Sequence, residues 1–302
     1  MKLIVCDPTA ADAIEAMREA GIDVDVRDDI TIEGLGEIIG EYDAMVVRSR
    51  TKVREPLIDK AENLDVIIRA GVGLDSIDVE YAQSKGIDVR NTPMASTNAV
   101  AELTVGYLFA LARQIPQVVA SMKEGKWEKK AYSKGTELAG KTLGIIGCGR
   151  IGTSVGRKAE ALGMKVLGCD PYVEHFDSCM LGTDQDEVLR ESDFISLHVP
   201  YTKETHHVIC AETFDKMKDG VYVVNCGRGG TVDEEALYNA IVSGKVAGAA
   251  LDVFEDEKED RGQRLMELPQ VIGSPHIGAG TMEAKRRVGE EVVRIAVEYL
   301  DK

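Results

Sequence analysis

Three residues whose side chains can bind a carboxylate or move a proton stand out in the last quarter of the sequence. Arg228 lies in Asn-Cys-Gly-Arg-Gly-Gly, Glu257 lies in an acidic stretch, and His276 lies in Gly-Ser-Pro-His-Ile-Gly-Ala. Each could have an ordinary structural role when taken alone: an exposed turn arginine, a solvated acidic residue and a buried histidine with satisfied hydrogen bonds. Each also follows a short apolar run typical of a parallel strand, so we expect all three at one edge of a sheet.

Together these residue types suit hydride transfer at a 2-hydroxy acid. A guanidinium can hold the substrate carboxylate and polarise the neighbouring carbonyl group. An imidazole can accept the hydroxyl proton as a hydride leaves for a nicotinamide ring, and can return it in the reverse reaction. A carboxylate behind the imidazole fixes its tautomer and stabilises the imidazolium. We therefore interpret Arg228, Glu257 and His276 as a candidate catalytic set.

A glycine pattern in the middle of the chain indicates a dinucleotide site. The run 143–146 leads into Gly-Cys-Gly-Arg-Ile-Gly, in which Gly147 permits a tight turn, Gly149 admits a pyrophosphate and Gly152 allows close packing of helix and strand. Asp170 ends the next apolar run, about 20 residues further on, where a carboxylate can accept from ribose hydroxyls. Because that carboxylate would repel a 2′-phosphate, the sequence favours NAD over NADP. The ordinary role of an aspartate at this position would be that of a turn residue before Pro171.

The elements that position these residues follow a regular alternation. Short apolar runs alternate with amphipathic stretches along the whole chain, which predicts an α/β protein with parallel sheets. The runs after Gly140 are apolar throughout, as in a doubly wound sheet that is covered on both faces. After His276 only a helical stretch follows, and it should pack against the first series of runs. We predict a Rossmann doubly wound domain, residues 94–280, inserted into a flavodoxin-like α/β substrate domain formed by residues 1–93 and 281–302.

The charge and the cysteine content of the chain limit the kinds of molecule it is expected to bind. The chain of 302 residues has 52 acidic against 36 basic residues, a net charge of −16, which disfavours nucleic acid and anionic membranes as partners. No apolar run reaches the about 20 residues that a membrane span requires. Six scattered cysteines without a C-x-x-C pair predict reduced thiols in a cytoplasmic protein, with neither a disulfide framework nor a metal site.

These motifs resemble those of the D-isomer-specific 2-hydroxyacid dehydrogenases, and the resemblance runs along the whole chain. Four further segments resemble the phosphoglycerate dehydrogenase branch of that family, namely 47–53, 69–75, 91–93 and 126–128. The resemblance implies NAD-dependent oxidation of 3-phospho-D-glycerate to 3-phosphohydroxypyruvate, the first step of serine biosynthesis. Because the sequence ends shortly after His276, we expect a short form without the C-terminal regulatory domain that senses serine.

The resemblance also implies roles for individual residues. Arg228 would bind the substrate, and Glu257 and His276 would form the acid–base pair. Further contacts to the dinucleotide would come from Arg150, Ile151, Cys226, Gly227, Asp252, Gly278 and Ala279. The chain departs from the family pattern at Lys258, where a proline usually follows the catalytic glutamate, so Glu255 is an alternative to Glu257.

The candidate substrate residues lie in two regions. In the first region, Arg48, Ser49 and Arg50 follow one predicted strand, and Gly71, Val72 and Gly73 follow the next with backbone N–H groups that can bind a carboxylate. The second region is a lysine cluster at residues 123–134, most of which is expected only to aid solubility. By resemblance, Lys129 and Lys130 would help to hold the phosphate across a homodimer interface. That interface would involve the predicted long helix at residues 96–111.

Three other functions remain open from the sequence. A glyoxylate or hydroxypyruvate reductase, or another D-2-hydroxyacid dehydrogenase, would share the same catalytic set. A formate dehydrogenase of this architecture typically pairs its histidine with glutamine, so Glu257 counts against that function. A non-catalytic, NAD-sensing protein of the transcriptional corepressor type would bind partners in response to NADH without turnover, and the complete catalytic set counts against it.

Overall fold

The computed structural model describes residues 1–177, 179–256 and 263–300. It divides into two compact units, one formed by Met1–Ser96 with Gly280–Lys302 and the other by Thr97–Ala279. Each unit contains one sheet, and every strand pair in both sheets is parallel. The predicted α/β fold class is therefore confirmed.

The first unit has a five-stranded sheet with the order β2-β1-β3-β4-β5, which is the flavodoxin-like order. Its strands are β1 (Lys2–Val5), β2 (Asp23–Val26), β3 (Ala44–Val47), β4 (Val66–Arg69) and β5 (Asp88–Asn91). Its helices are α1 (Ala11–Glu19), α2 (Ile32–Ile38), the short 3-10 helix η1 (Ile39–Glu41), α3 (Glu55–Ile58), α4 (Val79–Ser84) and α12 (Met282–Glu298).

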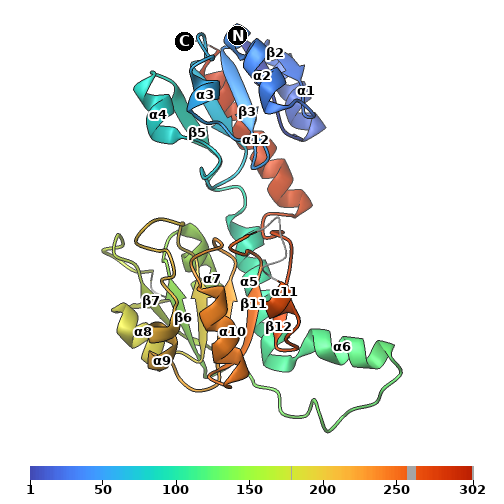
Figure 1. Ribbon diagram of the computed structural model, residues 1–302, viewed down its shortest axis with the longest axis vertical. Helices are drawn as coiled ribbons and strands as arrows, with labels where there is room; N and C mark the ends of the chain where they lie inside the picture. Colours follow the sequence, from blue (N-terminus) through green and yellow to red (C-terminus); the bar gives the residue numbers. More distant parts are fainter. Residues whose placement is uncertain (178, 257–262, 301–302) are drawn as a thin grey trace. The chain divides into compact units, whose positions relative to one another are not determined.

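The C-terminal helix α12 packs against α1 on one face of this sheet (Figure 1). Val292 and Ile295 of α12 share a buried cluster with Leu3 of β1. The two helices approach closely at Gly289, where an added Cβ would lie 2.9 Å from the Cβ of Ala13. The last helix thus completes the core of the first unit.

The second unit has a seven-stranded sheet with the order β12-β11-β10-β9-β6-β7-β8. Its strands are β6 (Thr142–Ile146), β7 (Lys165–Cys169), β8 (Leu181–Gly182), β9 (Phe194–Leu197), β10 (Val221–Asn225), β11 (Val246–Leu251) and β12 (Val271–Gly273). Its helices are α5 (Thr97–Arg113), α6 (Ile115–Lys123), α7 (Arg150–Ala161), α8 (Gln185–Glu191), α9 (Ala211–Lys216), α10 (Glu234–Val242) and α11 (Gln263–Met266). Chain order reverses between β6 and β9, the switch point at which doubly wound sheets bind ligands.

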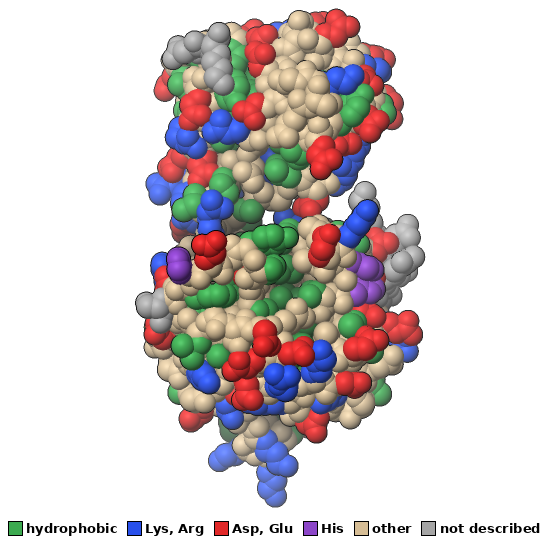
Figure 2. Space-filling view, turned by 90° about the vertical axis from the view of Figure 1, so that its left-hand side faces the viewer, with side chains coloured by type: hydrophobic (Ala, Val, Ile, Leu, Met, Phe, Trp, Pro, Cys, Tyr) green, Lys and Arg blue, Asp and Glu red, His purple; other side chains and the backbone are tan. Residues whose placement is uncertain are grey.

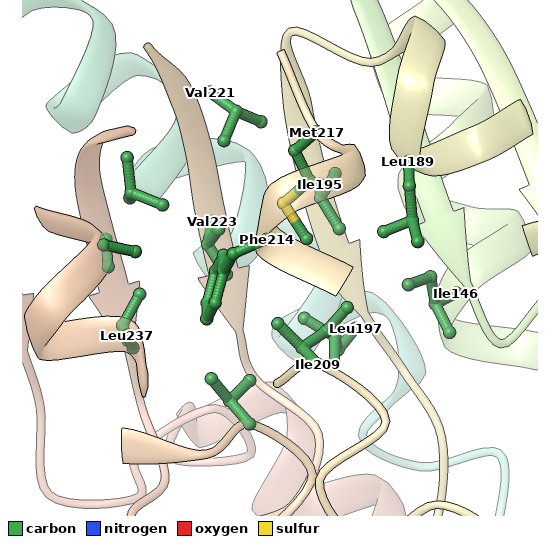
Figure 3. Packing of buried hydrophobic residues seen from close by; sticks show 14 of the residues in the cluster. Ile146, Leu189, Ile195, Leu197, Ile209, Phe214, Met217, Val221, Val223 and Leu237 are labelled. Carbon is green, nitrogen blue, oxygen red and sulfur yellow. The ribbon is translucent and has the colours of Figure 1, made fainter. Parts of the chain in front are cut away.

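Both faces of this sheet are covered, as its apolar runs predicted. On one face, Ile195 and Val223 of the strands meet Phe214 of α9 and Leu237 of α10 (Figure 3). On the other face, strand residues including Phe194 pack with α5 and α7. Burial on both faces keeps the strand ends fixed, which is what a precise site at the sheet edge requires.

An arm formed by α6 and residues 124–141 projects from the second unit (Figure 1). The arm begins at Gln114, whose φ of +52° ends α5 before Ile115 and Pro116 start α6. Acidic and basic side chains are interspersed over the face shown in Figure 2, and basic ones gather at its lower end, at the level of the arm. None of the described helices is long and apolar enough to cross a membrane.

Candidate active site

The glycine turn after β6 is shaped for an anionic ligand. Gly147 has φ +94°, and an added Cβ there would lie 2.7 Å from the backbone of His198. A Cβ on Gly152 would lie 2.1 Å from the carbonyl oxygen of Gly147, so α7 packs directly against the turn. A Cβ on Gly149 would meet no atom within 4 Å. This open space lies at the N-terminus of α7, where free N–H groups and the helix dipole attract a phosphate, and it therefore fits the pyrophosphate of a dinucleotide.

Asp170 is held against this turn in a defined orientation. One carboxylate oxygen accepts the backbone N–H of Cys148 at 2.8 Å, and the other accepts that of Tyr172 at 2.9 Å. The residue is half-buried, so each oxygen keeps a lone pair for a further donor. This placement suits the two hydroxyls of an adenosine ribose. Arg150 and Ile151 begin α7 beside the turn.

His198, Cys148 and Cys226 lie close to the ends of β9, β6 and β10, and their protonation is set by burial. His198 follows β9, and its Nε2 lies 2.8 Å from Ser196 Oγ while its Nδ1 is buried. Burial lowers the pKa of His198 from 6.5 to about 4, which keeps the ring neutral at physiological pH. Burial also raises the pKa of Cys148 and of Cys226 to about 12, so both thiols stay protonated. Neither thiol is therefore poised to act as a nucleophile.

The loop that carries Arg228 is fixed by Asn225, a residue that the sequence analysis did not single out. Asn225 is buried at the end of β10, where its amide donates to the carbonyl of Arg228 at 3.0 Å and accepts from Gly227 N at 3.0 Å. Thr231 Oγ1 donates to the same Arg228 carbonyl at 2.7 Å. The half-buried Arg228 side chain donates to Gly227 O at 2.8 Å. The guanidinium is thus presented on a loop in which the Arg228 carbonyl and the Gly227 N–H are bound by buried Asn225.

The chain that leads toward Glu257 lies directly against the Arg228 loop. A Cβ on Gly229 would lie 1.8 Å from the carbonyl oxygen of Phe254, so only glycine permits this approach. Glu257 itself lies outside the described residues. The alternative residue, Glu255, accepts from His207 Nε2 at 2.8 Å, and its backbone N–H donates to Glu234 at 2.6 Å.

His276 sits on a turn after β12 in an unusual backbone conformation. Its φ is +52°, in the left-handed region that non-glycine residues rarely adopt. Its backbone N–H donates to the carbonyl of Asp252 at 2.9 Å, and its side chain is exposed. The buried Asp252 carboxylate accepts the N–H groups of Ile277 at 2.8 Å and Gly278 at 2.7 Å. The resemblance implied a dinucleotide contact for Asp252, and the structure shows this carboxylate bound to the His276 turn.

The second unit therefore brings most of the candidate residues to one sheet edge. Arg228 follows β10, Asp252 follows β11 and His276 follows β12, and these three strands are neighbours. Cys226, Gly227, Gly278 and Ala279 belong to the same loops. A guanidinium and an imidazole at the carboxyl edge of a sheet, beside a dinucleotide turn, can orient a hydroxy acid and exchange its proton.

The candidate substrate residues of the first unit lie at the carboxyl edge of its own sheet. Asp7, which the sequence analysis did not single out, is fully buried after β1 and accepts the backbone N–H of Arg48 at 2.5 Å. The same carboxylate accepts Arg50 Nε at 2.9 Å and the Thr51 hydroxyl at 3.1 Å. Asp7 thus locks the loop that follows β3. Arg50 also donates to the carbonyl oxygen of Cys6, and Arg48 Nη1 donates to the carbonyl oxygen of Pro8 at 3.4 Å. The side chains of Arg48, Ser49 and Arg50 are all exposed.

Gly71, Val72 and Gly73 follow the neighbouring strand β4. Gly71 has φ +150°, and an added Cβ would collide with the Arg69 guanidinium at 1.3 Å. Asn91 donates to the carbonyl of Val72 at 2.6 Å. These contacts hold the Gly-Val-Gly backbone rigidly at the same edge as Arg48.

The two candidate lysines lie elsewhere, on the arm of the second unit. Lys129 and Lys130 are both exposed. Lys129 lines an open hollow of about 600 Å³ whose other walls are Phe109, Arg113, Ile115, Val118, Val119 and Tyr132. Both lysines belong to the arm, whereas Arg228 and His276 follow β10 and β12.

A doubly wound dinucleotide domain with an arginine and a histidine at its strand ends defines a nicotinamide-dependent dehydrogenase. Residues 105–278 match the family model described as D-isomer specific 2-hydroxyacid dehydrogenase, NAD binding domain. The chain belongs to this family, and it is an NAD-dependent D-2-hydroxyacid dehydrogenase. Among the described residues, no group of three or more histidine, cysteine, aspartate or glutamate side chains could hold a metal ion.

The curated relatives are named for two different activities. The hydroxypyruvate reductase of Thermotoga maritima is 54% identical over 86% of this chain and 85% of its own length. The D-3-phosphoglycerate dehydrogenase of Methanocaldococcus jannaschii is 49% identical over 96% of this chain and 55% of its own length. The chain thus spans about half the length of the phosphoglycerate dehydrogenases it matches. Among solved structures, the D-lactate dehydrogenase of Aquifex aeolicus, complexed with NAD and lactic acid, is 33% identical with a TM-score of 0.88, over 100% of this chain and 96% of that one.

Proposed function

We propose that this dehydrogenase oxidises 3-phospho-D-glycerate to 3-phosphohydroxypyruvate, the step that commits carbon to serine biosynthesis. The main evidence for a phosphorylated substrate is the structure of the loop after β3. Buried Asp7 fixes its backbone and engages Arg50, while the side chain of Arg48 stays exposed at the sheet edge. An exposed guanidinium on a rigid loop is suited to bind a phosphate.

Each catalytic residue has one task in this proposal. NAD, when bound, accepts the hydride from C2 of the substrate. Arg228 pairs with the substrate carboxylate and polarises the C2 oxygen. His276 accepts the C2 hydroxyl proton, and Glu257 stabilises the imidazolium that forms. The pairing of Glu255 with His207 favours Glu257 over Glu255 for this task.

The other candidate contacts follow from the same proposal. Gly147, Gly149 and Gly152 with Asp170 hold the dinucleotide, together with Arg150, Ile151, Cys226, Gly227, Asp252, Gly278 and Ala279. Arg48 and Ser49 bind the phosphate, and the backbone of Gly71, Val72 and Gly73 binds the carboxylate end. Arg50, which pairs with Asp7 and remains exposed, contributes a second guanidinium for the phosphate. All six cysteines are unpaired, which fits a reducing compartment such as the cytoplasm.

We also propose that the protein is a homodimer formed across α5 and the arm. Phe109, Ile115 and Val119 are each at least 40% exposed, and all three line the same hollow. A second copy would cover these apolar side chains and bring Lys129 and Lys130 to the phosphate of the partner's substrate. Light scattering should give the mass of a dimer, and Val119→Glu should give a monomer. A monomeric parent protein at micromolar concentration would contradict this assembly.

Hydroxypyruvate reduction is a second candidate, because the relative from Thermotoga maritima carries that name. Its substrate has the same carboxylate and C2 oxygen but lacks the phosphate. Arg228 and His276 would therefore act in the same way, and Arg48 would have no anion to bind.

A substrate panel followed by NADH absorbance separates the two candidates. The panel contains 3-phosphoglycerate, D-glycerate and D-lactate, and in reverse 3-phosphohydroxypyruvate, hydroxypyruvate and glyoxylate. A preference of a hundredfold or more in kcat/KM for the phosphorylated pair, worth ~2.7 kcal/mol, supports phosphate recognition. Arg48→Ala should then raise KM for 3-phosphoglycerate and leave D-glycerate unaffected. Equal rates on hydroxypyruvate would favour the second candidate.

A further inference from the structure

A line of hydrogen bonds connects α5 to the turn that carries His276. The ring of Tyr107 on α5 is buried, and its hydroxyl is hydrogen-bonded to Ser274 Oγ. Ser274 Oγ donates in turn to the carboxylate of Asp252. Tyr107 therefore reaches across to the ends of β11 and β12, although it belongs to a helix on one face of the sheet.

The direction of this line follows from proton counting. An ionised carboxylate has no proton to donate, so Ser274 must give its single hydroxyl proton to Asp252. Ser274 Oγ can then only accept from Tyr107, whose hydroxyl is the donor. Consecutive hydrogen bonds that run in one direction strengthen one another, and the last acceptor here is a charged group in a buried place.

The carboxylate at the end of this line clamps the turn on both sides of His276. Asp252 is 1% exposed, and it accepts from Ser274 before the histidine and from Ile277 and Gly278 after it. The left-handed φ of His276 costs about 1 kcal/mol or more and persists only where neighbouring contacts enforce it. These three bonds, with the one from Tyr107 behind them, supply that enforcement.

We propose that Tyr107 is a positioning residue for proton transfer. By orienting Ser274 toward Asp252, it holds the backbone of the turn so that the His276 imidazole meets the substrate oxygen in a reactive geometry. This inference rests on the proposed role of His276 as acid and base. Phenylalanine at position 107 would fill the same space, but it has no hydroxyl to donate a hydrogen bond to Ser274 Oγ.

The hydroxyl of Tyr107 can be removed alone, and the chain offers a matched control. Tyr107→Phe keeps the buried ring, so the fold of α5 is preserved. Tyr222 lies on β10 in the same unit and stacks on Phe194, with ring centroids 4.8 Å apart. Its hydroxyl makes no hydrogen bond to any described residue, so Tyr222→Phe makes the same chemical change outside the line.

The first measurement is the kcat for reduction of the best keto acid in the panel, in H2O and in D2O, together with the affinity for NADH by fluorescence titration. Tyr107→Phe should lower kcat about tenfold and raise the solvent isotope effect on kcat, because proton delivery becomes more rate-limiting. The dissociation constant for NADH should change less than twofold, and Tyr222→Phe should match the parent protein in all three quantities. A lower kcat with an unchanged isotope effect would indicate a merely structural role and would overturn the proposal.

Two further readouts complete the test. Ser274→Ala and the double variant Ser274→Ala/Tyr107→Phe should show the same loss of kcat, because Tyr107 and Ser274 act through one line of hydrogen bonds. If the loss in the double variant is instead the product of the two single losses, the residues act independently and the proposal is contradicted. Amide exchange in a peptide covering residues 274–280 should be about tenfold faster in Tyr107→Phe than in Tyr222→Phe, and equal rates would refute the anchoring itself. If the parent protein turns over nothing in the panel, the proposed function fails, and amide exchange still decides whether Tyr107 anchors the turn.

Discussion

Alanine at Gly152 and at Gly149 should separate folding of the second unit from binding of NAD. At Gly152, the new Cβ would lie 2.1 Å from the carbonyl oxygen of Gly147 and 3.1 Å from Ile145 Cγ2. A backbone oxygen cannot rotate away, so α7 and the β6 turn must separate by about 1 Å to restore normal contact. Overpacking of this kind costs about 3 kcal/mol. For a domain of this size we expect the Tm to fall by about 6–12 °C.

At Gly149 the same methyl group would meet nothing within 4 Å, and the φ of −68° suits alanine. We therefore expect a change in stability of less than about 0.5 kcal/mol. The methyl would instead occupy the space above the N-terminus of α7 that the pyrophosphate requires. A rise in the dissociation constant for NADH of about a hundredfold, or ~2.7 kcal/mol, is expected.

Thermal unfolding followed by circular dichroism and fluorescence titration with NADH measure the two effects separately. Gly36→Ala, in the first unit, is the matched control, because its Cβ would meet only the flexible side chain of Lys60. That control should bind NADH as the parent protein does. Normal NADH affinity in Gly149→Ala would refute the placement of the pyrophosphate, and normal stability in Gly152→Ala would refute the close contact between α7 and the turn.

Three further results are expected. Asp170→Ala should raise the NADP-to-NAD ratio of kcat/KM at least tenfold in steady-state assays, and an unaltered ratio would place the ribose contact elsewhere. Arg228→Ala should lower kcat/KM, and His276→Ala should lower kcat, each by a hundredfold or more; unchanged turnover in either variant would remove that residue from the site. Burial lowers the pKa of His198 from 6.5 to about 4, so the folded protein resists protonation that the unfolded chain accepts. Its contribution to stability is complete above pH 6.5 and is lost as the pH falls toward 4, a loss of roughly 3 kcal/mol at 1.36 kcal/mol per pH unit. Urea unfolding at pH 7.5 and pH 5 should show a smaller loss in His198→Gln than in the parent protein, and equal losses would contradict this origin.

Much of the fold could be predicted because its strands are short and apolar. A parallel strand buried on both faces carries few polar side chains, so Val221–Val224 and Val246–Leu251 could be predicted as strands from their continuous apolar sequence. The two residues of β8, Leu181 and Gly182, are exposed and offer no such pattern. The end of α5 at Arg113 lies within two residues of the predicted helix end at 111, but the separate helix α6 was not predicted. Its start depends on the left-handed φ of Gln114, and only the following Ile-Pro indicates a new helix.

The candidate site was less visible in the sequence than the fold was. Three glycines at this spacing, with a strand before them and a helix after them, are typical of a dinucleotide turn, so this part of the site was predictable. Asp7, Asn225 and Ser274 were not, because a short polar residue at a strand end is usually a turn residue. The side chain of Asn225 makes local contacts, to residues 227–231, but Asp7 and Arg48 are 41 residues apart in the chain, and Ser274 and Asp252 are 22 apart. Such contacts become visible only once the strand order is known.

The loops that present the candidate Arg48, Arg228 and His276 share one physical arrangement. In each loop the side chain proposed to meet the substrate is at most partly buried, while a buried polar residue at the end of a strand binds the loop's own backbone: Asp7, Asn225 and Asp252 respectively. A buried polar group left unpaired costs about 1–3 kcal/mol, so each of these residues resists any movement that would break its bonds. The loops are therefore held in place before a ligand arrives, and binding energy need not be spent on ordering them. A conservative change at the buried residue should consequently disturb activity through the position of its neighbour, even though the buried residue touches no substrate.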